Sequence, residues 1–126
     1  MDITIANYVD TAESVMKSFM KKPKKDKLTT TKIRNFLSLS QALYDQARLK
    51  TGPLANEEIA DLQHLRVRIV YESGRDKDKI VSEFVKESKI LDMLKNVGNN
   101  RDSLFLFCNY FEALVAYHRY FGGEDE

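Results

Sequence analysis

Few side chains in this sequence could carry out catalysis or bind a metal. The chain has two histidines, His64 and His118, and one cysteine, Cys108. Their spacing does not match a metal site, which needs several Cys or His ligands close together. Cys108 and His118 lie about 15 Å apart along a straight helix, which is too far for proton transfer between them. We therefore expect no metal, no cofactor and no catalytic site, and we predict that the protein is not an enzyme.

The same residues have ordinary structural interpretations. Cys108 lies in the most apolar stretch of the chain, so we expect a buried, unreactive thiol. His118 is expected to be a satisfied histidine in the core or at its rim. A single cysteine allows no disulfide within the chain, and the first residues are acidic where a signal peptide would be basic. Both observations make the cytoplasm the expected compartment.

Positive charge is distributed unevenly along the 126 residues, although the net charge is only +1. Residues 1–16 carry three acids and no base, and residues 17–50 carry ten Lys or Arg against two acids. Residues 51–126 carry ten Lys or Arg against fourteen acids. A chain with a basic third and acidic flanks can bind a polyanion, or it can bind another copy of itself.

The side chains best suited to bind a polyanion are arginines, because a guanidinium binds phosphate with a bidentate fork. An alternative is that each cation is paired internally with Asp or Glu. The Lys-rich segment 21–27 is either a solvated connection or a phosphate contact, and the sequence leaves both open. Aromatic residues lie mostly on buried stripes, so contact with a phosphate backbone is favoured over base stacking. The candidate cations are Lys32, Arg34, Arg66, Arg68 and Arg75.

Helical periodicity without strand patterns predicts an all-α bundle that positions these cations. About five helices are expected: 5–20, 30–49, a third from Asn56 to Gly74, a fourth from Asp76 to about Asn96, and 100–121. In the third helix, Arg66 falls on the apolar stripe with Val70, while Arg68 lies on the outer face. Leu65 and Val67 widen the apolar arc of that helix.

The last predicted helix, 100–121, is apolar on nearly every side and is expected at the centre of the bundle. Asn109, Glu112, His118 and Arg119 interrupt the run, so a membrane span is disfavoured. Asn100 is a candidate N-cap, and Gly122 suits a left-handed C-terminal turn. We predict a single domain over residues 1–126, with an acidic tail at 124–126.

Three stretches resemble a known family. They are TTTKIRNFLSLS at 29–40, LRVRIVYESGRD at 65–76 and FCNYFEALVAYHRYFGG at 107–123. In order and spacing they are similar to the small helical subunit of type III-A CRISPR effector complexes, the Csm complexes. The resemblance covers residues 5–123, and its last stretch is the most specific part.

This resemblance implies a non-catalytic, RNA-binding role in antiviral defence. Copies of such a subunit stack head to tail as an inner filament, beside other Csm subunits that hold the guide RNA. Basic side chains then support the duplex of guide RNA and target RNA. The matched positions are Lys32, Arg34, Arg66, Arg68 and Arg75, with Arg48, Lys50 and Arg119 as weaker candidates. The alternative is a helical protein–protein adaptor that makes no direct contact with RNA.

Overall fold

The computed structural model describes residues 3–23 and 28–122 and contains only helices and connecting turns within them. The bundle is all-α, as the periodicity predicts. Its helices are α1 (Tyr8–Phe19), α2 (Thr30–Ala47), α3 (Asn56–Arg75), α4 (Ile80–Ser88), α5 (Ile90–Val97) and α6 (Arg101–Tyr120).

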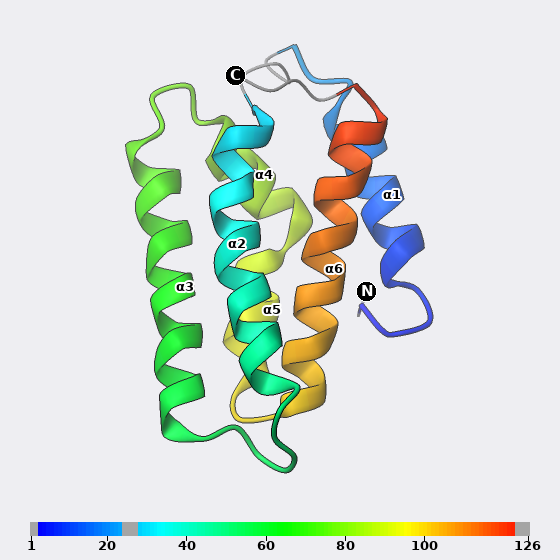
Figure 1. Cartoon of the computed structure of the whole chain (residues 1–126). Coiled ribbons are helices and arrows are strands. Elements are labelled where there is room, and N and C mark those ends of the chain that lie inside the picture. Colours follow the sequence, from blue (N-terminus) through cyan, green and yellow to red (C-terminus); the bar gives the residue numbers. More distant parts are fainter. Residues whose placement is uncertain (1–2, 24–27, 123–126) are drawn as a thin grey trace.

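Helix α6 lies at the centre of the bundle, which confirms the prediction from its apolar sequence. It packs against α1, α2 and α5, while α3 packs against α2, α4 and α5. Figure 1 shows α6 between α2 and α1, with α3 on the far side of α2. Helices α1 and α3 are therefore the outermost elements on opposite sides of the molecule.

A chain of aromatic rings fills the core between α1, α4 and α6. The ring centroids of Phe19 and Phe84 are 5.9 Å apart, and those of Phe84 and Phe111 are 6.4 Å apart. Phe107 stacks on Phe111 at 6.0 Å. All four side chains are buried, so they fix α6 against α1 and α4 through apolar burial and edge-to-face packing.

Several predicted helix ends are confirmed. The sequence offers Thr29, Thr30 and Thr31 as N-caps of the second helix. Thr29 is the cap of α2, and its side chain accepts a hydrogen bond from the Lys32 amide. Asn100 caps α6 by accepting a hydrogen bond from the Ser103 amide. Gly122 follows α6 with φ 98°, in the left-handed region that glycine tolerates.

Other predicted ends are wrong. Helix α1 begins at Tyr8 instead of residue 5. The sequence predicts Asn56 as the N-cap of the third helix, but Asn56 is the first helical residue of α3 and Ala55 stands at the N-cap. The Glu58 carboxylate accepts the hydrogen bond of the Ala55 amide at 2.9 Å, so a side chain in the first turn replaces a capping side chain.

The predicted fourth helix is two helices, and the count of about five becomes six in the described residues. The break lies at Lys89, whose φ of 63° is left-handed. The carbonyl of Ser88 accepts a hydrogen bond from the Tyr110 hydroxyl at 2.8 Å. Tyr110 on α6 thus satisfies a polar group beside the break. Burial raises the pKa of Tyr110 to about 12. A left-handed lysine leaves no sequence signal, because glycine is the usual residue there.

The predicted inner face of α3 is partly wrong. Leu62, Leu65 and Ile69 are buried, but Val67 and Val70 are exposed to 63% and 56%. Arg66 is half-buried at the edge of the helix rather than in the core. Gly74 lies inside α3, which continues to Arg75 instead of ending at the glycine.

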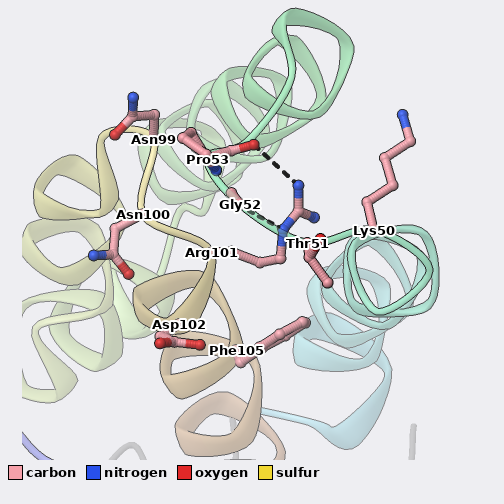
Figure 2. Close-up of a pocket in the computed structure, with 9 residues that line it drawn as sticks. All are labelled: Lys50, Thr51, Gly52, Pro53, Asn99, Asn100, Arg101, Asp102 and Phe105. Carbon is pink, nitrogen blue, oxygen red and sulfur yellow. Dashed lines mark hydrogen bonds between the residues drawn. The ribbon is translucent and has the colours of Figure 1, made fainter.

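A buried ion pair joins three segments at one end of the bundle. The Arg101 guanidinium, at the start of α6, contacts the Glu58 carboxylate with two hydrogen bonds of 2.7 and 3.0 Å. It also donates to the carbonyls of Ala47, Gly52 and Pro53 at 2.8, 2.9 and 3.1 Å. Figure 2 shows the guanidinium of Arg101 beside Gly52 and Pro53. All five N–H donors of the guanidinium are therefore used inside the protein.

Candidate nucleic-acid interface

Three of the five predicted cations lie along one edge between α2 and α3. The two helices are antiparallel neighbours, so the first turn of α2 lies beside the last turn of α3 (Figure 1). Lys32 and Arg75 line the same groove, which has a volume of about 530 Å³. Its other charged lining residues are Lys77 and the acids Glu72, Asp76 and Asp78. Arg68 adjoins this groove through Glu72, which lines it. We call Lys32, Arg68, Arg75 and Tyr71 the α2–α3 cluster.

Glu72 is shared by two arginines in this cluster. Its carboxylate lies 2.9 Å from Nη2 of Arg68 and 2.8 Å from Nε of Arg75. The two guanidiniums also lie over the Tyr71 ring, at 5.7 and 5.9 Å from its centroid. One carboxylate and one ring therefore hold two cations in place, and the local charge stays positive.

Lys32 is paired across the groove with Asp76, at 3.5 Å. Burial by itself would raise the pKa of the Asp76 carboxyl. Its hydrogen bond from the Val81 amide and the charge of Lys32 outweigh that effect and lower the pKa. Asp76 is therefore ionised at neutral pH. The sequence predicts Asp76 as the cap of the fourth helix, but α4 begins at Ile80 with Lys79 at its N-cap.

The cations of the cluster stand further out than the acids. The side chains of Arg75, Arg68 and Lys32 are 65%, 41% and 30% exposed, against 21% for Glu72 and 9% for Asp76. An approaching anion therefore meets N–H donors before carboxylates. Backbone contact with phosphates needs such outward donors and no particular base sequence.

The other two predicted cations do not join this cluster. Arg34 lies two residues from Lys32 on α2, which is about 200° around the helix axis, and it is exposed. Arg66 lies two residues from Arg68 on α3 and likewise leaves the helix on another side. Its Nη1 donates to Gln63 at 2.9 Å. Within the described residues, Arg34 makes no ion pair.

The weaker candidates are scattered over the surface. Arg48 and Lys50 follow α2, and Figure 2 shows the Lys50 side chain extending away from Arg101. Arg119 is exposed in the last turn of α6. Of the Lys-rich segment, residues 24–27 lie outside the described residues, and Lys22 is paired with Glu87 at 2.7 Å.

Cys108 and His118 have the structural roles expected of them. Burial raises the pKa of the Cys108 thiol to about 11, and its Sγ lies 3.4 Å from the Ser40 carbonyl. His118 is fully buried, and its Nε2 donates to the Leu28 carbonyl at 2.7 Å. The described residues contain no group of Cys, His, Asp and Glu arranged to hold a metal. Nor is any helix among them both long and apolar enough to cross a membrane.

The sequence interpretation missed Tyr71 and Arg101. Tyr71 is 55% exposed, whereas the aromatic residues were expected on buried stripes. Its position between Arg68 and Arg75, three residues before and four after it, was the available signal, because such positions share one helix face. Arg101 carries no comparable local signal, since its partner Glu58 is 43 residues away.

Comparison with known proteins identifies the family. Residues 3–124 match the model of the family described as Csm2 Type III-A. This chain belongs to the Csm2 family. It is 39% identical over 127 residues to the CRISPR system Cms protein Csm2 of Mycobacterium tuberculosis (strain ATCC 25618 / H37Rv), and the match covers 100% of both chains.

Two further Csm2 proteins show how far the likeness extends. The Csm2 of Streptococcus thermophilus is 40% identical over 125 residues, which cover 98% of each chain. The Csm2 of Enterococcus italicus is 35% identical over 99 residues, covering 75% of this chain and 68% of the other. The resemblance inferred from residues 29–40, 65–76 and 107–123 is therefore confirmed, and the match covers nearly the whole chain.

Proposed function

We propose that this Csm2-family chain is the non-catalytic small subunit of a type III-A CRISPR effector complex. In that complex its copies stack head to tail and contact the backbone of the duplex of guide RNA and target RNA. The observation that carries the RNA contact is the α2–α3 cluster, in which outward cations are held by deeper acids. Its partners are guide RNA, target RNA and the other Csm subunits.

The chemistry of the cluster suits a backbone contact. Base pairing between guide and target supplies the sequence specificity, so a protein beside the duplex needs only phosphate contacts. Arg75 keeps the Nη atoms of its guanidinium for a ligand, since the ion pair with Glu72 uses Nε. The shared carboxylate restrains both arginines before RNA arrives, which lowers the entropy lost on binding.

Fluorescence anisotropy of a labelled guide–target RNA duplex tests the proposal. The double variant Arg68→Glu/Arg75→Glu should bind at least about tenfold more weakly, because two phosphate contacts become repulsions. Its matched control is Lys17→Glu/Lys95→Glu, which makes the same charge change at exposed residues of α1 and α5. Equal losses in both double variants would contradict a site at the cluster. Circular dichroism establishes that both variants remain folded.

The alternative function is a helical adaptor that binds only protein. Its support is that Lys32, Arg68 and Arg75 each have an acidic partner within the chain. Salt separates the two functions, because phosphate contacts weaken steeply between low and high salt while an apolar protein interface does not. An adaptor would retain its protein partners in a high-salt pull-down, and no RNA would be eluted at either salt concentration.

A further inference from the structure

Exposed apolar side chains gather on the two outermost helices. Seven large apolar side chains are exposed in the described part of the chain, and five of them lie near the start of α1 or on α3. Ile5 and Val9 are 80% and 43% exposed, and Val67 and Val70 are more than half exposed. These residues mark two apolar surfaces that no other part of the described chain covers.

The surface on α3 continues into a groove between α3 and the α4–α5 pair. The groove has a volume of about 500 Å³, and its apolar lining comes from Val70, Val85 and Leu91. Its lysines are Lys79, Lys86 and Lys89, against a single lining acid, Asp92. No ion pair involving these lysines occurs between described residues. We call this the lysine groove.

Two of these lysines have an unusual backbone conformation. Lys79 and Lys89 flank α4, and both have φ of 63°. Left-handed conformations are uncommon for residues other than glycine and carry a steric cost from Cβ. A glycine would relieve that cost at either position. Both side chains are exposed and pair with no described acid, so their ammonium groups are available to a partner outside the chain.

The surface on α1 has the opposite charge. Val9 and Glu13 lie four residues apart on one face of α1, and the exposed Lys17 follows at the next turn. Ile5 lies in the turn just before the helix. Asp10 and Glu13 are exposed beside the apolar residues. Residues 1–16 contain no Lys or Arg. We call Ile5, Val9, Asp10 and Glu13 the acidic ridge.

We propose that the acidic ridge of one copy of this chain docks into the lysine groove of the next copy. Apolar residues of the ridge cover the exposed Val70, and its carboxylates face the lysines. The ridge lies at the start of α1 and the groove lies between α3 and the α4–α5 pair, so they are different surfaces of one chain. The contact is therefore heterologous, and its repetition generates an open filament or a ring. This assignment rests on the proposed stacking and names the surfaces that make it.

Disulfide cross-linking between variants that each carry one added cysteine tests this contact. Val9→Cys and Val70→Cys chains of different tag length are mixed at high concentration and oxidised. One helix in one groove is a small contact compared with the roughly 800 Å² per partner of stable complexes, and cross-linking detects such short-lived contacts. The native Cys108 is buried. We expect the 9–70 product to exceed the 9–9 and 70–70 products at least fivefold.

Leu49→Cys is the matched control for Val70→Cys, because Leu49 is 78% exposed on another part of the surface. The 9–49 product should stay at the level of random collision. Equal yields of 9–70 and 9–49, or a lack of cross-linking in all mixtures, would overturn the proposal. In the assembled complex, a link from position 70 to a different subunit in place of position 9 would also overturn it.

A second variant separates the contact from folding. Lys89→Gly removes the ammonium group and relieves the left-handed backbone, so the melting temperature should rise by a few degrees. In the same variant the 9–70 yield should fall at least twofold, and Lys86→Glu should lower it further. An unchanged yield in both variants would exclude the lysines from the contact. Binding of guide–target RNA should persist in Lys89→Gly, so failure of this contact and failure of RNA binding are distinguishable.

Discussion

Two pairs of arginine and glutamate in this molecule differ in what surrounds them. Arg101 and Glu58 are 8% and 5% exposed, and all five guanidinium donors are used within the protein. Arg75 is 65% exposed, shares Glu72 with Arg68, and keeps donors that face solvent. The same two residue types therefore make an internal tie at one end of the bundle and a candidate RNA contact at the other.

The difference shows that an ion pair alone does not identify a function. The Arg101–Glu58 pair joins α6 to α3, to the end of α2 and to the loop after it. Its loss should therefore lower the stability of the whole fold. The Arg68–Glu72–Arg75 group lies within one helix and crosses to no other element. Exposed pairs of this kind contribute little to stability, which leaves their donors available for a ligand.

The largest expected effect comes from breaking the buried pair. Arg101→Met leaves the Glu58 carboxylate buried without its guanidinium partner and removes a donor from each of three carbonyls. We expect the melting temperature to fall by roughly 10 °C or more, measured by circular dichroism. Arg75→Met is the matched control and should change it by no more than a few degrees. A smaller fall in melting temperature in Arg101→Met than in Arg75→Met would show that the buried pair does not stabilise the fold more than the exposed one.

The stability that the Arg101–Glu58 pair provides should also depend on pH. Hydrogen bonds from Arg101 are the largest cause that lowers the pKa of the Glu58 carboxyl below 4.5, and they outweigh the opposite effect of burial. Because the folded pKa is the lower one, the stabilisation is complete above pH 4.5. It is lost as the pH falls through the lowered value.

Melting temperatures measured between pH 7 and pH 3 test this expectation. Glu58→Gln should be less stable than the native chain at pH 7, and the gap should narrow towards pH 3. Asp76, whose pKa is also lowered, keeps part of the acid dependence in both proteins. A constant gap over the whole range would show that Glu58 does not titrate as its contacts with Arg101 imply.

The exposed arginine should matter for RNA and not for the fold. Arg75→Gln removes one charge from the α2–α3 cluster, so affinity for the guide–target duplex should fall severalfold. The slope of log affinity against log salt should decrease by about one. Lys95→Gln removes the same charge at an exposed position of α5 and serves as the control. A slope that changes equally in both variants would move the contact away from the cluster.

The smallest effect sharpens the comparison between the two glutamates. Glu72→Gln removes the carboxylate that Arg68 and Arg75 share and leaves both guanidiniums beside Tyr71. We expect RNA affinity to rise about two- to threefold because the local charge becomes more positive. The melting temperature should change by only a few degrees. A weaker affinity would show that Glu72 is needed to orient the arginines more than its charge opposes RNA.

Local sequence signals predicted much of the fold. The caps at Thr29 and Asn100, the turn at Gly122 and the central place of α6 each depend on residues within a few positions of one another. Such short-range chemistry is visible in the sequence. The break at Lys89 was not visible in the sequence. The Ser88 carbonyl beside it accepts a hydrogen bond from the Tyr110 hydroxyl, and Tyr110 lies 22 positions further along the chain. The sequence pattern also assigned Val70 to the core because it did not show that α3 lies at the side of the bundle.

The candidate site was predictable in composition but not in arrangement. All five cations could be selected from the sequence as candidates for phosphate contact. Their division into the α2–α3 cluster and the separate positions of Arg34 and Arg66 follows from the packing of α2 against α3. Helical geometry by itself placed Arg66 and Arg68 on different sides of α3. It did not indicate which side faces α2.

The sequence by itself determined an all-α protein of the Csm2 family, its central apolar helix and the set of cations that could meet RNA. Tertiary structure decided which arginine uses all its donors within the protein and which remains exposed to solvent. Arg101 and Arg75 have the same guanidinium and the same charge. What separates them is burial and the distance along the chain to their partners. Those quantities are set only when α2, α3 and α6 pack together, because desolvation and hydrogen bonding depend on neighbours in space and not in sequence.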